Sequence, residues 1–171
     1  TERLVQGPLE NAETVRLALG VAEALSHVHS RGILHRDLKP SNLIFGPSGE
    51  LLLTDFCLAK DLAEDAERLT QTGQVMGTPN YMAPEQAAPS EKLPVSAATD
   101  IYGFGAVLFE MLSGRPPFLG DQTLELLTQV VSVPPPALRS LNPAIDPRLE
   151  AICRLCLEKD PADRYSDCEA L

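Results

Sequence analysis

One short polar segment of the sequence holds side chains whose types and spacing suit a chemical reaction. Asp37 and Asn42 are five residues apart, Lys39 lies between them, and Asp55 follows thirteen residues after Asn42. Phosphoryl transfer requires a group that orients the accepting hydroxyl, oxygen ligands for a hard cation, and positive charge near the phosphate. Two carboxylates, an amide and a lysine supply these groups. The segment therefore predicts a phosphoryl-transfer site.

A hairpin after this segment must bring its parts together. Residues 43–45 and 51–53 are apolar and flank a Gly-Pro-Ser-Gly turn, which predicts two short strands. The hairpin would return Asp55 to the side of Asn42. Both side chains could then bind one magnesium ion.

The residues before the segment predict a helix of about five turns. Asn11 is expected to cap this helix and Gly32 to end it. Its apolar face would comprise Val15, Ala18, Ala22, Leu25 and His29. His27 and His29 could suggest a metal site, but residues two apart on a helix point about 200° away from each other. Both are interpreted as ordinary helix residues.

Further helices predicted downstream make the chain mainly α. A short helix is expected after Glu85. Residues 100–112 are apolar on nearly all sides, as in a helix buried through the middle of a lobe, and Ser113-Gly114 would end it. Amphipathic helices are predicted over residues 121–131 and 147–158, on either side of a proline-rich loop, and a last helix would begin near Ser166.

Length and composition exclude several classes of function. The 171 residues suffice for one domain or a piece of one, and a net charge of −10 argues against nucleic-acid binding. No stretch approaches the roughly 18 apolar residues of a membrane span, and no signal-peptide pattern opens the sequence. The chain is therefore expected to contain no membrane segment.

The cysteines indicate a reducing compartment. Cys57, Cys153, Cys156 and Cys168 form no disulfide framework, so we expect a cytoplasmic location. Cys153 and Cys156 have the spacing of half a zinc site, but no second pair follows them. Buried thiols on a helix are the favoured interpretation.

Four motifs carry a resemblance to a known family. Residues 35–42, His-Arg-Asp-Leu-Lys-Pro-Ser-Asn, match every fixed position of the pattern H-R-D-L-x-x-x-N. Residues 77–85 end in Ala-Pro-Glu, residues 100–105 are Asp-Ile-Tyr-Gly-Phe-Gly, and residues 159–164 are Lys-Asp-Pro-Ala-Asp-Arg. In this order they resemble the bacterial eukaryotic-like (Hanks-type) serine/threonine protein kinases. The resemblance implies the mainly α C-terminal lobe of the α+β protein-kinase fold, with small β-hairpins.

The resemblance assigns catalytic and cofactor roles to five residues. Asp37 would orient the substrate hydroxyl or accept its proton, and Lys39 would neutralise the transferring phosphoryl group. Asn42 and Asp55 would hold Mg²⁺, with Mn²⁺ as a possible substitute. Ile44 would form the floor under the adenine ring of ATP, which is compatible with its alternative role as hairpin core.

Structural roles follow for five more residues. His35 and Phe56 would pack the catalytic loop, residues 35–42, against the segment that carries the metal ligand Asp55. Asp100 would hold the loop backbone by hydrogen bonds. Glu85 and Arg164 would form a buried ion pair.

A regulatory hypothesis concerns the segment between these motifs. Thr78 would hydrogen-bond the catalytic Asp–Lys pair and shape the protein-substrate platform. Arg36 and Lys60 would face one another and receive a phosphate on Thr70 or Thr72. In the alternative interpretation both of these threonines are solvated loop residues.

Two departures from the family pattern bear on activity. Cys57 occupies the glycine position of D-F-G, where a Cβ restricts the backbone, so activity is expected to be weakened or differently gated. The chain also lacks the glycine-rich loop and the V-A-I-K strand, and residues 103–105 do not replace them. Residues 1–171 are therefore predicted to be a partial kinase domain, from just after the hinge into the last helix, with little activity without the N-terminal lobe.

In the intact protein the resemblance implies ATP- and magnesium-dependent transfer of the γ-phosphate to serine or threonine hydroxyls of protein substrates. A pseudokinase-like binding or scaffold module is the first alternative. Cys57 favours it, whereas the retained Asp37, Lys39, Asn42 and Asp55 count against it. A small-molecule kinase is the second. The Gly-Thr-Pro to Ala-Pro-Glu segment, a protein-substrate platform by resemblance, argues against the second.

Overall fold

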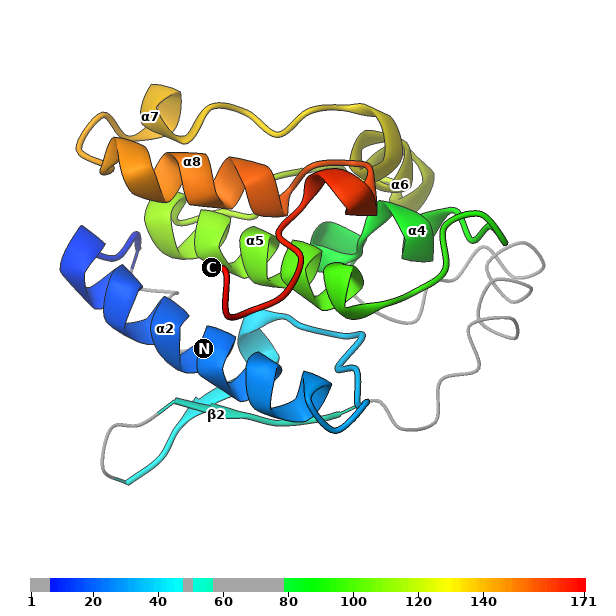
Figure 1. Cartoon of the computed structure of the whole chain (residues 1–171). Helices are drawn as coiled ribbons and strands as arrows, with labels where there is room; N and C mark the ends of the chain where they lie inside the picture. Colours follow the sequence, from blue (N-terminus) through cyan, green and yellow to red (C-terminus); the bar gives the residue numbers. More distant parts are fainter. Residues whose placement is uncertain (1–6, 48–50, 57–78) are drawn as a thin grey trace.

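Helix α5 (Ala97–Ser113) runs through the middle of the molecule, and the other long helices pack around it (Figure 1). The computed structural model describes residues 7–47, 51–56 and 79–171. Every residue from Thr99 to Phe109 is buried, and Gly114 ends the helix with a φ of 77°. Glycine is the usual residue in a left-handed C-cap, because it has no Cβ. The predicted buried helix and its predicted end at Ser113-Gly114 are both confirmed.

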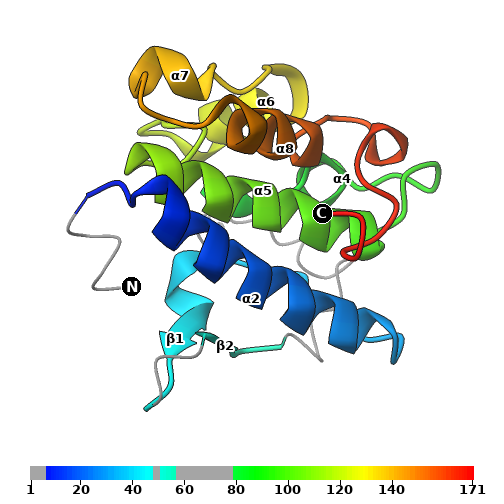
Figure 2. The same ribbon diagram turned by 60° about the vertical axis from the view of Figure 1, so that its left-hand side comes forward.

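Helix α2 (Asn11–His29) lies against α5 and also contacts the hairpin (Figure 2). The side chains that it buries are Thr14, Leu17, Val21, Ala22 and Leu25. Ala18, Ala22 and Leu25 of the predicted apolar face do pack against the core, but Val15 was wrongly included because it is 40% exposed. Asn11 is not the cap, because the helix already includes it and Glu10 precedes it as N-cap. The Asn11 amide instead donates to the Ala144 carbonyl at 3.0 Å and accepts from the Asp146 N–H at 3.2 Å.

Strands β1 (Leu43–Phe45) and β2 (Leu51–Leu53) form the predicted antiparallel hairpin. Leu43 pairs with Leu53, Ile44 with Leu52 and Phe45 with Leu51. The N–H of Thr54 donates to the Asn42 carbonyl at 2.9 Å, which continues the pairing by one residue toward the catalytic loop. This hairpin is the only sheet in the described part of the chain.

The remaining helices are α4 (Pro84–Ala87), α6 (Thr123–Ser132), α7 (Leu138–Leu141) and α8 (Pro147–Cys156), with short 3₁₀ turns at Pro40–Asn42, Pro79–Tyr81 and Pro161–Asp163. Helices α7 and α8 pack against α5, whereas α4 and α6 pack against each other and α6 also contacts the Pro79–Tyr81 turn. Asp146 caps α8 by accepting the Arg148 N–H at 2.8 Å. The mainly α fold class is confirmed.

Two parts of the predicted helix pattern are wrong. Helix α7 lies inside the segment that was predicted as a proline-rich loop. No helix begins near Ser166. Asp167 instead accepts the N–H groups of Glu169 and Ala170, at 3.0 and 2.9 Å, so this side chain satisfies the donors of a turn that does not continue as a helix.

The three described cysteines are free and buried. Burial raises the pKa of the Cys153 thiol well above its usual range and that of the Cys168 thiol to about 12. The interpretation of Cys153 and Cys156 as buried helical thiols is confirmed. Among the described residues, no helix has the length and apolar character needed to cross a membrane.

The close approach of α5 and α8 depends on Gly105. A Cβ at this position would lie 2.6 Å from the Cβ of Cys156 and 3.1 Å from the Cγ of Leu157. Gly105→Ala is expected to lower the free energy of unfolding by about 1–3 kcal/mol because of this overlap. Urea denaturation will measure the change. Gly20→Ala is the control: its Cβ would meet only Leu51 at 3.6 Å, and the gain in helix propensity should stabilise α2 by up to about 1 kcal/mol. Equal effects of the two substitutions would contradict the packing argument.

Candidate active site

Asp100, in the first turn of α5, fixes the backbone of the catalytic loop. Its Oδ2 accepts the His35 N–H at 2.8 Å and its Oδ1 accepts the Arg36 N–H at 2.7 Å. The Gln86 side chain donates to the Arg36 carbonyl at 2.7 Å. Arg36 has a φ of 66°, a left-handed conformation that is costly for a residue with a Cβ. Hydrogen bonds on both sides of the residue hold it there.

This backbone places three polar side chains of the loop together. Lys39 Nζ lies 2.7 Å from Asp37 Oδ2, and the Asn42 Nδ2 donates to the Asp37 carbonyl at 2.8 Å. The Asp37 side chain is 28% exposed and the Lys39 side chain 23%, so the pair is partly open to solvent. The Asn42 side chain is buried, and its Oδ1 accepts a hydrogen bond from the Ser41 hydroxyl at 3.4 Å, so the amide is oriented by contacts at both of its ends.

Asp55 follows the hairpin and is the second exposed carboxylate of the site. The Asn42 carbonyl accepts both the N–H and the hydroxyl of Thr54, the latter at 3.1 Å. Asp55 is the next residue after this contact. Asp55 has a φ of 59°, a second left-handed conformation in this region. Asn42 and Asp55 thus place an amide and a carboxylate at the two ends of one hairpin, and oxygen donors of these types would fit a hard divalent cation.

His35 connects the loop to the Asp55 segment. Its Nε2 lies 2.9 Å from the Thr54 carbonyl, and its ring lies 4.9 Å from the Phe56 ring, centroid to centroid. His35 is fully buried. These contacts place His35 and Phe56 where the sequence analysis expected packing residues.

The exposed face of the hairpin lies next to this loop. Ile44 and its strand partner Leu52 are 45% and 42% exposed. Ile44 therefore offers an apolar surface beside Asn42 and is not a buried residue of the hairpin core.

Glu85 and Arg164 form a bidentate ion pair in the interior. The two guanidinium–carboxylate distances are 2.8 and 2.9 Å, and Thr99 donates its hydroxyl to the same carboxylate at 2.8 Å. Burial alone would raise the pKa of Glu85, but the hydrogen bond and charge of Arg164 outweigh it and lower that pKa. Arg164 also donates to three backbone carbonyls, those of Glu158, Lys159 and Ala98.

Lys159 joins this ion pair to helix α6. Its Nζ donates to the Val130 carbonyl, in the last turn of α6, at 2.6 Å and lies 4.4 Å from the centre of the Phe118 ring. Burial lowers the pKa of Lys159 to about 8, and the nearby Arg164 charge adds to the effect.

The segment after residue 78 is fixed by side chains that the sequence analysis missed. Asn80 donates to the Phe118 carbonyl at 3.0 Å, and the Tyr81 hydroxyl bonds the Glu110 carboxylate on α5. Burial and this bond raise the pKa of Tyr81. Neither residue stands out in the sequence, because their partners are 38 and 29 positions away.

His29 was also missed. Its Nε2 lies 2.8 Å from Asp100 Oδ2, so it is not the ordinary helix residue that was predicted. The test applied to the sequence asked only whether His27 and His29 share a helix face. The signal that could have indicated this contact is the position of His29 in the last turn of the helix, six residues before the catalytic loop.

Five residues of the predicted site lie outside the described residues: Cys57, Lys60, Thr70, Thr72 and Thr78. Their predicted roles stay predictions. Arg36 Nε is buried and finds no hydrogen-bond partner in the described part of the chain.

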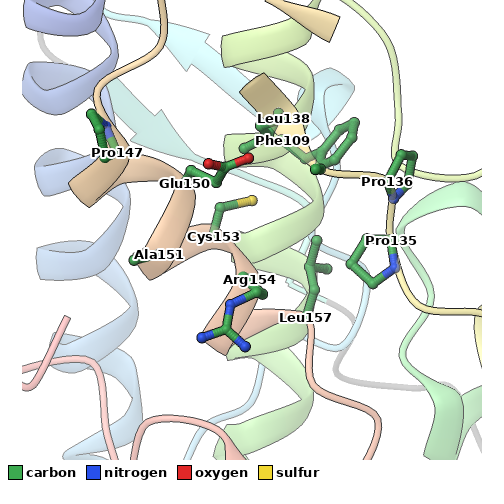
Figure 3. A pocket seen from close by; sticks show the side chains of 11 residues that line it. Phe109, Pro135, Pro136, Leu138, Pro147, Glu150, Ala151, Cys153, Arg154 and Leu157 are labelled. Carbon is green, nitrogen blue, oxygen red and sulfur yellow. The ribbon is translucent and has the colours of Figure 1, made fainter. Parts of the chain in front are cut away.

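A separate cavity of about 320 Å³ lies between α8 and the proline-rich segment (Figure 3). Phe109, Leu138 and Leu157 line it, and the side chains of Glu150 and Cys153 also border it. None of its lining residues, all of them in the described part of the chain, belongs to the catalytic loop or the hairpin. The cavity is therefore distinct from the candidate active site.

Comparison with known families matches residues 1–171 to the protein kinase domain. The chain belongs to the protein kinase family. Three relatives illustrate the similarity. The serine/threonine-protein kinase PknA of Mycobacterium tuberculosis is 41% identical over 156 residues, which cover 89% of this chain and 34% of PknA. PknB of Lactococcus lactis, a probable serine/threonine-protein kinase, is 37% identical over 96% of this chain and 25% of its own length. SCO3848 of Streptomyces coelicolor, also a probable serine/threonine-protein kinase, is 36% identical over 92% and 23%.

The chain thus spans between about a quarter and a third of the length of these kinases. Protein kinases generally use ATP together with a divalent cation. The loop between α2 and β1 matches the sequence pattern of the kinase catalytic loop, and Asp100 and the hairpin position it in this chain.

Proposed function

We propose that the protein carrying this chain transfers the γ-phosphate of ATP to serine or threonine hydroxyls of protein substrates. The observation that carries the proposal is the Asp37–Lys39 pair, 2.7 Å apart and partly exposed, on a loop whose backbone Asp100 holds. A carboxylate that orients a hydroxyl and a cation beside it are the groups that phosphoryl transfer needs. Membership of the protein kinase family supports the same reaction.

Each residue of the proposed site has one task. Asp37 accepts a hydrogen bond from the substrate hydroxyl and aligns its oxygen with the phosphorus atom. Lys39 keeps positive charge beside the transferred group. Asn42 and Asp55 hold Mg²⁺, for which Mn²⁺ can substitute, and Ile44 lies under the adenine ring. The bound metal–ATP complex supplies the phosphoryl group and neutralises much of its charge.

The proposal includes the partners of the site. Residues 1–171 form the helical C-terminal lobe of the kinase domain, and an N-terminal lobe completes the ATP site. Thr78 shapes the platform for the protein substrate, and Arg36 with Lys60 receives a phosphate on Thr70 or Thr72. The buried, free thiols of the described cysteines support a reducing cytoplasmic environment.

Labelled ATP distinguishes this function from its rivals. The protein carrying this chain is expected to transfer γ-³²P to serine or threonine of a generic protein substrate. EDTA should abolish the transfer, and Mg²⁺ should restore it. Asn42→Ala and Asp55→Ala should raise the Mg²⁺ concentration needed for half-maximal rate. ATP binding without transfer would instead support the pseudokinase alternative, which is suggested by Cys57 at the glycine position of the D-F-G motif. Label on a small molecule and none on protein would indicate a small-molecule kinase.

A further inference from the structure

His29 meets Asp100 at the carboxylate that holds the catalytic loop. The His29 Nε2 lies 2.8 Å from Asp100 Oδ2, and that same oxygen accepts the His35 N–H at 2.8 Å. Asp100 Oδ1 accepts the Arg36 N–H at 2.7 Å. One carboxylate therefore joins the last turn of α2, the first turn of α5 and the two residues that precede Asp37.

The Asp100 carboxylate is buried, and the His29 imidazole is one of the groups that compensate its charge. The Asp100 side chain is 1% exposed and the His29 side chain 12% exposed. A buried carboxylate is costly unless hydrogen bonds and an opposite charge compensate it. The two loop N–H groups supply dipoles, whereas His29 is the only described residue whose side chain pairs with Asp100 and can carry positive charge.

The second nitrogen of the ring faces a sulfur atom. Cys168 Sγ lies 3.7 Å from His29 Nδ1. The thiol donates to Nδ1 when the imidazole is neutral, and its sulfur accepts the Nδ1 proton when the ring is charged. The site therefore accommodates both protonation states of the ring without a change of rotamer.

Two elements supply the charged and titratable groups in this part of the molecule. Helix α5 supplies Asp100. The C-terminal segment supplies Cys168 together with the exposed Asp167 and Glu169, and Glu169 also accepts a hydrogen bond from Ser26 of α2 at 3.4 Å. The catalytic loop contributes backbone N–H groups to the shared carboxylate.

We propose that His29 is a positioning residue for the catalytic loop, and that protonation of its imidazole tightens the hold of Asp100 on the N–H groups of His35 and Arg36. An imidazolium bond to a carboxylate is stronger than a neutral one. An imidazole gains and loses a proton with pH, so the proposal couples the rigidity of the loop to the protonation state of His29. Its consequence for phosphoryl transfer rests on the proposed function, but the contact and its test do not.

Amide hydrogen exchange on the full chain tests the proposal without any assay of activity. NMR measures protection of the His35 and Arg36 amides from pH 5.5 to 8.5, relative to the Val107 amide in the core of α5, which reports global opening. In the wild-type chain this ratio should fall several-fold as the His29 ring loses its proton with rising pH. The NMR resonances of the His29 ring itself report when that proton is lost. His29→Leu should lower the ratio on the order of tenfold at low pH, because a charge-assisted bond is lost.

Two further variants separate the charge from the hydrogen bond. His29→Gln keeps an N–H donor that does not titrate, so the ratio should become independent of pH. His27→Gln, on the same helix but outside this contact, should behave as the wild type. A pH slope that persists in His29→Gln would assign the effect to another group and overturn the proposal. An unchanged ratio in His29→Leu, with Val107 still protected, would overturn it as well.

Discussion

Replacing Arg164 with methionine will lower the free energy of unfolding by about 3–5 kcal/mol, because it leaves the Glu85 carboxylate buried without its counter-charge. Arg164 supplies two bonds to that carboxylate, at 2.8 and 2.9 Å, and three more to backbone carbonyls. Thr99 alone cannot replace them. Urea denaturation of the wild-type and variant chains measures the difference.

The exposed pair Arg154–Glu158 provides the matched control. Arg154 is 69% exposed and its contact is 3.4 Å long, so Arg154→Met should change stability by at most about 0.5 kcal/mol. A double variant, Glu85→Met with Arg164→Met, should recover part of the loss because no buried charge is left unpaired. A loss below about 1 kcal/mol in Arg164→Met would contradict the assignment of a buried ion pair.

Acid provides a second measurement of the same pair. The pKa of Glu85 is lowered in the folded chain, chiefly because Arg164 overcomes the effect of burial. The stability that this shift contributes is present above the unfolded pKa of a glutamate, roughly 4.3, and is lost as pH falls through the folded pKa. The stability curves of wild type and Arg164→Met should therefore converge below that window and separate above it.

Local pattern was sufficient for the elements that repeat along the sequence. Two short apolar segments around a turn predicted the hairpin. The unbroken apolar stretch predicted α5, because burial on all sides leaves no polar face. The bounds of α2 were close and most of its predicted face packs on the core, but Val15 was included where Leu17 is buried. Val15 and Leu17 are both apolar, and only the position of α5 decides which of them is buried.

Long-range contacts explain what the sequence did not predict. Asn11 has the chemistry of a cap, yet its amide bonds a loop more than 130 residues away. His29 has the chemistry of a surface residue on a helix, yet Asp100 lies 71 positions further along the chain. Side-chain type and spacing carry no information about such partners. The motifs did place Asp37, Asn42 and Asp55 on one loop and hairpin, since those residues are joined by local chain geometry.

Replacing Asp37 with asparagine will reduce phosphoryl transfer by about 10²–10⁴-fold in the protein that carries this chain, if the proposed function holds. Asparagine keeps the size of the side chain but cannot accept the proton or attract Lys39. The backbone of the loop should not change, because Asp100 and Asn42 bind main-chain atoms of residues 35–37. Initial rates with labelled ATP at saturating substrate measure the loss.

Stability and ATP affinity decide how that loss is interpreted. The Asp37–Lys39 pair is partly exposed, with side chains 28% and 23% accessible, so Asp37→Asn should alter the free energy of unfolding by no more than about 1 kcal/mol. Asp121→Asn makes the same change of charge at an exposed position outside the loop and should leave the rate unaltered.

ATP should bind the Asp37 variant and the wild type with similar affinity, since the metal ligands proposed here are Asn42 and Asp55. A rate within a factor of about ten of the wild type would remove Asp37 from the reaction. Equal ATP binding with no transfer by either protein would favour a scaffold that keeps the kinase loop without its turnover.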